Sequence, residues 1–296
     1  MRRVDEFASF DGTRLHYSVE GDGPLDVVLC DGIGCNGFIW RYLRPMLLER
    51  ARVIHMHMRG HGSSGPPVDD QAVGINHIAD DWDGLLQHLG SENAVVLGHS
   101  MGVQVTLELW HRHARRVGGM VLICGSYQNP VETFHDNDRF SRLLPLIRGA
   151  TRLGGRALAQ IWKKAVMLPM AYSVALATEL HPDQIRRRDF EPYLEHLASM
   201  DPTLFMTMLT EAEAHSSAEY LSDVDVPVLV VAGEQDRFTP PRLSEKMAQL
   251  IPGAECLMVD AATHTAPIEQ PTLINLHIRR FVDRCDASGR VAVPAG

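Results

Sequence analysis

The sequence predicts an α/β fold with a mainly parallel sheet that is covered by helices on both faces. Short apolar runs alternate with stretches of helical periodicity, and this alternation is typical of such sheets. The chain has 296 residues, of which 45% are hydrophobic and 22% are charged. This composition is that of an ordinary globular enzyme, and the length is sufficient for a large core. We therefore expect one elaborated α/β domain with an insertion.

The chain should open with an antiparallel hairpin. Residues 6–10 and 14–20 flank the segment Asp11-Gly12-Thr13, and an Asp-Gly pair is a strong hairpin turn signal. The apolar run 27–30 then leads through a glycine-rich loop, 31–37, into a stretch of helical pattern, which indicates a β-loop-α unit. Further strand-like runs, separated by helical patterns, lie at 53–56, 94–97, 117–124, 226–232 and 254–259.

The alternation stops between about residues 128 and 219, where Leu, Met, Ala and Arg predominate. This pattern predicts a helical insertion, or cap, at 128–219, between two parts of the core at 1–127 and 220–296. Apolar stripes in the insertion favour packing, and a few of its Met and aromatic side chains are candidates to line an apolar pocket. Because proline is poorly tolerated inside a helix, five prolines should divide the segment into short helices. They are Pro145, Pro169, Pro182, Pro192 and Pro202.

The charge and the apolar patterning argue against two classes of partner. The formal net charge of −9 provides no basic surface for nucleic acid or for an anionic membrane. No apolar run approaches the length that spans a bilayer, and the basic residues at the start are not followed by an apolar segment. We expect a cytoplasmic protein whose partner is a small molecule.

Cysteine and histidine usage predicts neither a disulfide framework nor a metal site. The five cysteines form an odd set, and the sequence favours buried free thiols. No H-E-x-x-H motif or paired cysteine cluster is present, and the i, i+2 histidine pairs suit strand faces or helix surfaces as readily as ligands. These pairs are His55 with His57 and His111 with His113. We expect no cofactor.

The segment Gly98-His99-Ser100-Met101-Gly102 carries the strongest functional signal. It follows an apolar run and precedes an amphipathic helical pattern, which is the context of a nucleophile elbow. Small residues at positions 98 and 102 suit a sharp strand-to-helix turn. The alternative is a chance match in which Ser100 only caps a helix.

An acid and a base for Ser100 follow downstream in the order Ser…Asp…His. Asp236 follows the apolar run 228–232, and His264 follows the last strand-like run. The carboxyl ends of parallel strands meet at one edge of a sheet, so the three side chains should converge. Asp260 is a second candidate acid, although it also suits a loop cap. The sixth strand leads to Gly125-Ser126-Tyr127 and offers no carboxylate.

With these motifs the chain resembles the α/β-hydrolase superfamily over nearly its whole length. The resemblance implies the α/β-hydrolase fold, with a mostly parallel eight-stranded sheet and an inserted helical cap. It assigns the oxyanion hole to the backbone N–H groups of Ile33 and Met101. The common family pattern has His-Gly where this chain has Asp31-Gly32. A carboxylate pointing toward an oxyanion would repel it, so Asp31 should turn away and hydrogen-bond loop amides.

A second segment, 58–64, resembles the family's R-G-x-G-x-S stretch. Its glycines allow a tight turn, and Arg59 should tie neighbouring loops together. We therefore expect a structural role for this segment.

The predicted reaction is hydrolysis of a carboxylic ester through an acyl-enzyme. His264 would take the proton of Ser100, and Asp236 would orient His264. Serine at position 100 argues against haloalkane dehalogenases and epoxide hydrolases, which generally use an aspartate nucleophile in this superfamily. Lactonases, carbon–carbon bond hydrolases, cofactor-free perhydrolases or haloperoxidases, and acyltransferases share the same motifs. A non-catalytic ligand receptor on the same fold is an alternative of another class.

Overall fold

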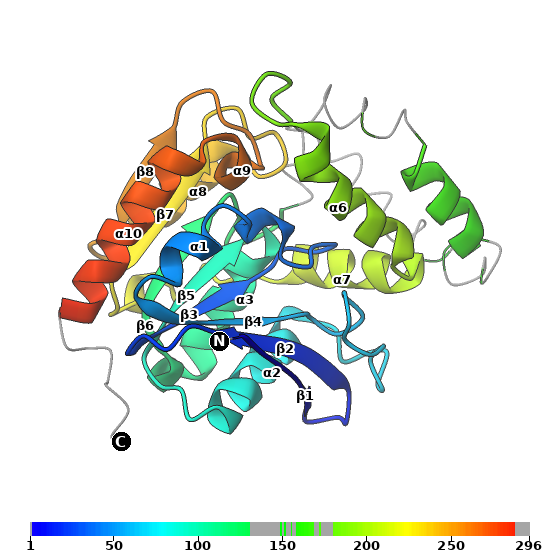
Figure 1. Cartoon of the computed structure of the whole chain (residues 1–296), viewed down its shortest axis with the longest axis horizontal. Helices are drawn as coiled ribbons and strands as arrows, with labels where there is room; N and C mark the ends of the chain where they lie inside the picture. The colour runs from blue at the N-terminus through cyan, green and yellow to red at the C-terminus, as the bar shows by residue number, and fades with distance from the viewer. Residues whose placement is uncertain are drawn as a thin grey trace.

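An eight-stranded sheet forms the centre of the protein in the computed structural model (Figure 1). The structure describes residues 2–130, 149, 151, 155, 158–168, 172 and 180–287. The strands are β1 (Arg2–Ala8), β2 (Arg14–Glu20), β3 (Leu25–Cys30), β4 (Ala51–Met56), β5 (Ala94–His99), β6 (Val117–Ile123), β7 (Val228–Gly233) and β8 (Glu255–Val259). The helices are α1 (Arg44–Leu47), α2 (Ile75–His88), α3 (Met101–Arg112), α6 (Arg187–Ser199), α7 (Pro202–Ala214), α8 (Pro241–Leu250), α9 (Ala266–Glu269) and α10 (Pro271–Ala287), with a short 3-10 turn η1 (Phe38–Trp40).

The strand order is β1-β2-β4-β3-β5-β6-β7-β8. The pairs β1–β2 and β2–β4 are antiparallel, and the other five pairs are parallel. The mostly parallel sheet and the opening hairpin are therefore confirmed. The first strand ends at Ala8 rather than Phe10, because Asp11 accepts a hydrogen bond from the Thr13 N–H and Ser9 bonds the Thr13 carbonyl. These contacts place residues 9–13 in the turn.

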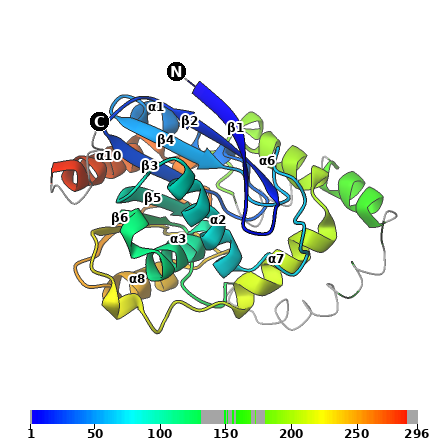
Figure 2. The ribbon, with the colours of Figure 1, turned by 90° about the horizontal axis from the view of Figure 1, so that it is seen from below.

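Two apolar layers cover the two faces of the sheet. Along β3, Val27 and Leu29 pack into one layer and Val28 and Cys30 into the other, as the alternation of side chains along a strand requires. The first layer includes α1 and α10, and the second includes α2, α3 and α8; Figure 2 shows these helices on opposite sides of the strands. Every residue of β3, β5, β6 and β7 is buried, so coverage on both faces is confirmed.

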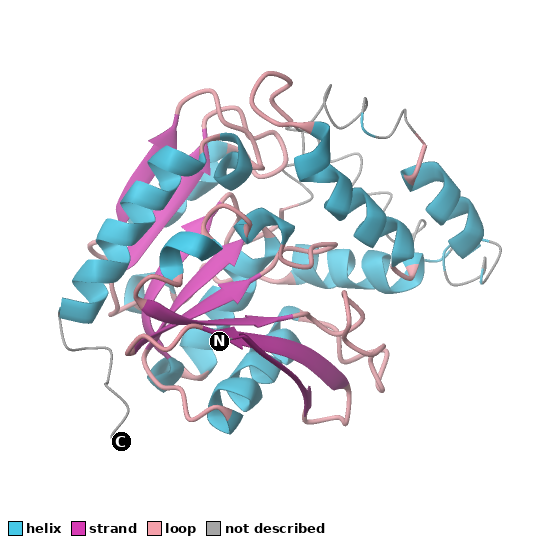
Figure 3. Ribbon diagram, in the orientation of Figure 1, coloured by secondary structure: helices cyan, strands magenta, loops and turns pink. Residues whose placement is uncertain are grey.

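Helices α6 and α7, which lie between β6 and β7 in the sequence, lie beyond the carboxyl ends of the strands (Figures 1 and 3). A Cβ added at Gly34, just after β3, would lie 3.3 Å from side-chain atoms of Tyr193 and Leu197 on α6. A Cβ at Gly60, just after β4, would lie 2.0 Å from Leu204 on α7. The two helices therefore pack directly on the loops that follow these two strands.

The proline pattern is borne out at the start of α7 but is wrong for α6. Pro202 is the first residue of α7, whereas Pro192 lies inside α6. A proline leaves the carbonyl four residues earlier without its helical donor. Here that carbonyl belongs to Arg188, and Arg41 Nη1 donates to it over 3.3 Å. Pro145 and Pro169 lie outside the described residues.

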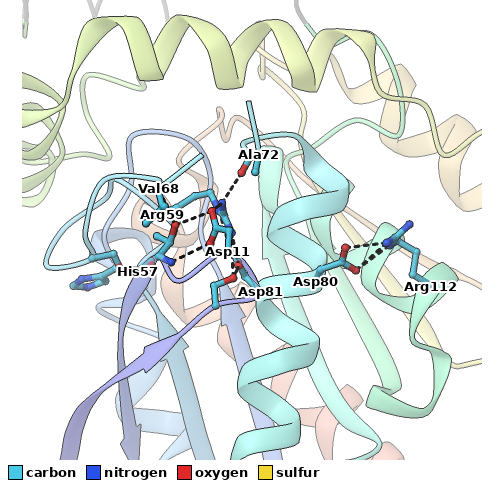
Figure 4. Close-up of polar contacts among 11 residues, drawn as sticks. Asp11, His57, Arg59, Val68, Ala72, Asp80, Asp81 and Arg112 are labelled. Atoms are coloured by element: carbon cyan, nitrogen blue, oxygen red, sulfur yellow. Dashed lines mark hydrogen bonds and ion pairs between the residues drawn. The ribbon is translucent and has the colours of Figure 1, made fainter. Parts of the chain in front are cut away.

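Arg59 joins three segments in a polar cluster in which Arg59 and Asp81 are fully buried (Figure 4). Its Nε and Nη2 donate to the two carboxylate oxygens of Asp81 on α2, over 2.8 and 2.6 Å, and Nη1 donates to Asp11 in the first hairpin turn over 3.0 Å. Nη1 also donates to the Ala72 carbonyl over 2.6 Å. These contacts match the structural role expected of Arg59.

The cysteine prediction holds for four of the five residues. All five lie in the described part of the chain and are free thiols, and four are buried. Cys256 is exposed because it lies on β8, the last strand of the sheet, whose amino-terminal half faces solvent. Among the described residues, no helix is long and apolar enough to cross a membrane.

Candidate active site

Ser100 lies at the sharp turn between β5 and α3, with φ 56° and ψ −123°. A positive φ is strained for a residue with a side chain, and such strain concentrates at functional sites. The turn depends on two glycines: a Cβ at Gly98 would lie 2.3 Å from the Gly102 carbonyl oxygen, and one at Gly102 would lie 2.3 Å from the Cys30 carbonyl oxygen. The close approach explains why both positions are glycine, as the elbow motif predicts.

The structure brings Ser100, His264 and Asp236 together in one hydrogen-bonded chain. Ser100 Oγ lies 3.0 Å from His264 Nε2, and His264 Nδ1 lies 2.9 Å from Asp236 Oδ2. Within the described residues, the Ser100 side chain makes no capping hydrogen bond to α3. The hydroxyl is therefore directed at an imidazole, which is the arrangement that activates a serine nucleophile.

Asp236 is held rigidly behind His264. Its carboxylate is 3% exposed and accepts hydrogen bonds from the N–H groups of Phe238 and Thr239 over 2.8 and 2.9 Å. The Thr239 hydroxyl donates to Oδ2 over 2.9 Å. Asp260 is an exposed residue directly after β8, and the carboxylate that contacts the imidazole is that of Asp236.

His99, the residue before Ser100, contacts the loop that carries His264. Its Nε2 donates to the backbone carbonyl of His264 over 2.9 Å, and the ring is 2% exposed. Burial and the neighbouring His264 lower the pKa of His99 to about 4, so the ring is neutral at pH 7. The sequence analysis missed this residue, whose only signal was its place inside the G-x-S-x-G motif.

Gly32 brings the loop after β3 against Ser100. A Cβ at this position would lie 2.8 Å from Ser100 Cβ and 3.1 Å from the His99 carbonyl oxygen. The peptide that joins Gly32 to Ile33 therefore lies beside Ser100. Met101, the other expected oxyanion donor, is the first residue of α3. Both N–H groups thus belong to backbone that adjoins the Ser100 turn.

His61 holds the other side of this loop. Its Nε2 accepts a hydrogen bond from the Gly34 N–H over 3.1 Å, and its Nδ1 donates to the Arg59 carbonyl over 3.1 Å. The side chain is fully buried, and burial lowers its pKa to about 4. The sequence analysis treated the R-G-x-G-x-S segment as a turn and missed the role of its variable residue.

Asp31 accepts hydrogen bonds from two side chains rather than from the loop amides that the sequence analysis expected. Its Oδ1 accepts from Trp40 Nε1 over 2.7 Å, and its Oδ2 lies 2.8 Å from His55 Nε2. Burial by itself would raise the pKa of this carboxyl, but His55, His57 and the Trp40 indole hold the pKa below its usual value. Asp31 is therefore an ionised carboxylate in a buried setting.

The histidine pairs noted in the sequence contact other protein groups. His113 lies 2.8 Å from Asp80, and the His111 ring stacks on Tyr220 with 3.9 Å between centroids. The His55 and His57 rings lie 5.3 Å apart, edge to face. A search of the described residues finds no group of three or more His, Cys, Asp or Glu side chains that could hold a metal ion.

The fold and the site define a hydrolase of the α/β type, and comparison with known proteins agrees. A family model for the alpha/beta hydrolase fold matches residues 27–271. The chain belongs to the alpha/beta hydrolase fold family.

Proteins similar to this chain are named for several different activities. A putative carbamate hydrolase, RutD from Azorhizobium caulinodans, is 27% identical over 281 residues, which cover 92% of this chain and 96% of the relative. A thermophilic esterase from Thermogutta terrifontis has a TM-score of 0.72 and 25% identity, covering 96% of this chain and 99% of that one. The enol-lactonase from Burkholderia xenovorans LB400 has a TM-score of 0.77 and 22% identity, covering 94% of this chain and 100% of that one.

Proposed function

We propose that this protein is a serine hydrolase that cleaves carboxylic esters with a small to medium, apolar acyl group. The observation that carries the proposal is the chain of hydrogen bonds from Ser100 through His264 to Asp236 at the strained turn after β5. A serine hydroxyl is a weak nucleophile unless a base removes its proton as it attacks. The contacts of His264 with Ser100 and with Asp236 support the roles of base and orienting acid for these two residues.

In the proposed reaction, His264 Nε2 takes the Ser100 proton while Oγ attacks the ester carbonyl. The backbone N–H groups of Ile33 and Met101 donate to the oxyanion that forms. Protonated His264 gives its proton to the leaving alkoxide, and Ser100 keeps the acyl group as an ester. His264 then activates a water, which releases the acid. Asp236 holds the imidazole with Nδ1 protonated and stabilises its charged form.

We propose residues 128–219 as a helical cap over the site, between core parts at 1–127 and 220–296. The contacts of α6 with Gly34 and of α7 with Gly60 support a position over the strand ends. The isolated bridge between Gln128 and Ser216 joins the two ends of this segment. The Met and Leu content of the cap supports an apolar acyl group, and the substrate would be a small molecule.

The test is hydrolysis of a chain-length series of p-nitrophenyl acyl esters by the wild-type chain and by Ser100→Ala. We expect wild-type turnover with an optimum at a short or medium acyl chain. Removal of the nucleophile should reduce kcat by about 10⁴-fold or more, with unchanged folding by circular dichroism. Turnover that survives in Ser100→Ala, on folded protein, would refute the assignment of the nucleophile.

The same preparation distinguishes the other members of the family. A lactone panel is included because a lactone is a cyclic ester and the enol-lactonase shares this fold. If only lactones are hydrolysed, the proposed substrate becomes a cyclic ester, and the roles proposed for the triad stay the same. If neither the esters nor the lactones are hydrolysed, the proposed function is replaced by an alternative. The alternatives are cleavage of a carbon–carbon bond, peroxide-dependent chemistry or a non-catalytic receptor.

A further inference from the structure

Asp31 and His55 form a buried pair behind the loop that carries Gly32 and Ile33. Asp31 Oδ2 lies 2.8 Å from His55 Nε2, and the two side chains are 0% and 5% exposed. His55 belongs to β4 and is in register with Leu29 on the neighbouring strand β3. Asp31 is the first residue after β3. The pair therefore joins the start of the loop to the next strand of the sheet.

The second oxygen of Asp31 is held from another direction. Trp40 Nε1 donates to Oδ1 over 2.7 Å, and Trp40 lies in η1, the turn that follows the loop. Hydrogen bonds to an ionised carboxylate are short and strong, and they fix the orientation of the group. One donor comes from the sheet and one from the far end of the loop, so Asp31 is fixed relative to both.

The residue after Asp31 is the one that touches the nucleophile. A Cβ at Gly32 would lie 2.8 Å from Ser100 Cβ, so the backbone there has no room to shift toward Ser100. A movement of Asp31 is transmitted through one peptide to the Ile33 N–H. Because catalysis depends on donor geometry, a displacement of about 1 Å can lower the rate by about 10²-fold.

We propose that Asp31 and His55, with the Trp40 indole, are positioning residues that hold the Ile33 N–H in place for the oxyanion. This inference rests on the proposed function, in which Ile33 donates to the oxyanion. It also explains how an acid can occupy the position at which the common family pattern has the His of a His-Gly pair. Both of its oxygens have donors within the fold.

The test compares Asp31→Ala with Asp31→Asn. Asparagine retains an acceptor for Trp40, and its amide can donate to His55 Nε2 in the other tautomer. We expect Asp31→Ala to lower kcat by about 10- to 100-fold with KM within about twofold, because the interaction acts in the transition state. Asp31→Asn should retain kcat within about threefold.

The matched control is Asp26→Ala. Asp26 is near the start of β3, whereas Asp31 directly follows its end, and the Asp26 carboxylate binds Arg52 on β4 over two contacts of 2.6 Å. The two aspartates thus make the same kind of inter-strand contact, at opposite ends of β3. We expect Asp26→Ala to lower stability while kcat stays within about twofold.

Two results would overturn the inference. One is a folded Asp31→Ala with kcat within twofold of wild type. The other is a loss in Asp31→Asn that equals the loss in Asp31→Ala, which would assign the effect to charge rather than position. If Asp31→Ala does not fold, His55→Phe and Trp40→Phe each remove one donor and retain a ring, and an unchanged kcat in both would overturn the inference.

A second readout separates this inference from the ester proposal. The rate at which a p-nitrophenyl phosphonate modifies Ser100 depends on the nucleophile and the oxyanion donors, whatever the natural substrate is. If the wild-type chain hydrolyses no ester but is phosphonylated, the same ranking of variants is expected in the labelling rate. A wild-type chain that shows neither reaction would overturn both proposals.

Discussion

His99 Nε2 donates to the backbone carbonyl of His264 over 2.9 Å. His99 ends β5 and directly precedes Ser100, whereas His264 lies in the loop after β8. The bond therefore ties the backbone of the proposed base to the residue next to the proposed nucleophile. The lowered pKa of His99 leaves its ring neutral at pH 7, and the bond to a carbonyl acceptor selects the tautomer with the proton on Nε2.

His99→Phe should lower kcat with little change in KM. Phenylalanine fills the ring volume but has no donor, so the carbonyl of His264 loses its partner and the imidazole loses orientation. We expect kcat to fall by about 10-fold, measured by steady-state hydrolysis of the preferred p-nitrophenyl ester. His111→Phe is the control, because it also replaces a histidine ring in contact with protein, here Tyr220. Equal kcat in the two variants would contradict the prediction.

Gly32→Ala should nearly abolish activity. The added methyl group would lie 2.8 Å from Ser100 Cβ and 3.1 Å from the His99 carbonyl oxygen, so the loop or the nucleophile must move. We expect kcat to fall by about 100-fold or more. The control is Gly65→Ala, where the nearest atom to the new Cβ would be 3.5 Å away. Ester turnover and the urea midpoint should be measured for both, and full activity in Gly32→Ala would show that the loop tolerates displacement.

Stability should fall as the pH decreases from about 6.5 to about 4. Burial lowers the pKa of His57 to about 3 and the pKa of His61 and His99 to about 4, whereas unfolded histidines titrate near pH 6.5. In this window the unfolded chain binds more protons than the folded chain, so protonation favours unfolding. Above about pH 6.5, where these histidines are neutral in both the folded and the unfolded chain, their contribution to stability is complete.

Urea unfolding at pH 7.5 and pH 5.0 measures this effect. The midpoint should be lower at pH 5.0, and His61→Gln should narrow the difference because it removes one of the three groups while an amide oxygen still accepts from Gly34. His113→Gln is the control, because His113 is a partly exposed histidine that contacts Asp80. Equal midpoints at the two pH values in the wild-type chain would rule the prediction out.

Arg59→Met should destabilise the fold far more than Arg112→Met. Arg59 is fully buried against Asp81, which would remain as an uncompensated buried charge, and breaking such a pair costs about 3–5 kcal/mol. Arg112 and Asp80 are 39% and 28% exposed, and pairs of this kind contribute about 1 kcal/mol or less. Figure 4 shows both arginines against α2.

Urea unfolding gives the free energy of unfolding of the Arg59→Met and Arg112→Met variants. Adding Asp81→Asn to Arg59→Met should recover part of the stability that Arg59→Met loses. The pKa of Asp81 is already raised, chiefly by burial, so the carboxyl in the single variant is expected to bind a proton more readily. Similar losses in the two arginine variants would show that the buried cluster contributes no more than a surface pair.

The sequence predicts which strands end in the serine, the acid and the histidine, because the motifs that mark these strand ends are local. The apolar run of β5 leads directly into Gly98 and Ser100, and acidic and histidine loops follow β7 and β8. Parallel strands bring their carboxyl ends to one edge of the sheet, so the sequence alone indicates that Ser100, Asp236 and His264 lie close together. The mostly parallel, doubly covered sheet followed from the same alternation of runs.

Other features depend on contacts between segments far apart in the chain. His55 lies 24 residues from Asp31, and His99 lies 165 residues from His264. No local pattern specifies such pairs, because a polar side chain in a loop has many possible partners until the sheet register is set. Pro192 inside α6 is a similar case, since the Arg188 carbonyl that it leaves without a helical donor accepts a hydrogen bond from Arg41, 147 residues earlier.

The sequence by itself thus determined the class of fold, the strained serine turn and the three residues of the proposed triad, because hydrophobic periodicity and turn chemistry act over a few residues. Only the tertiary structure decided how the loop beside Ser100 is held, through Asp31, Trp40 and His61. The physical reason is that a buried polar group must find a partner, and packing of distant strands and helices decides which partner lies within reach.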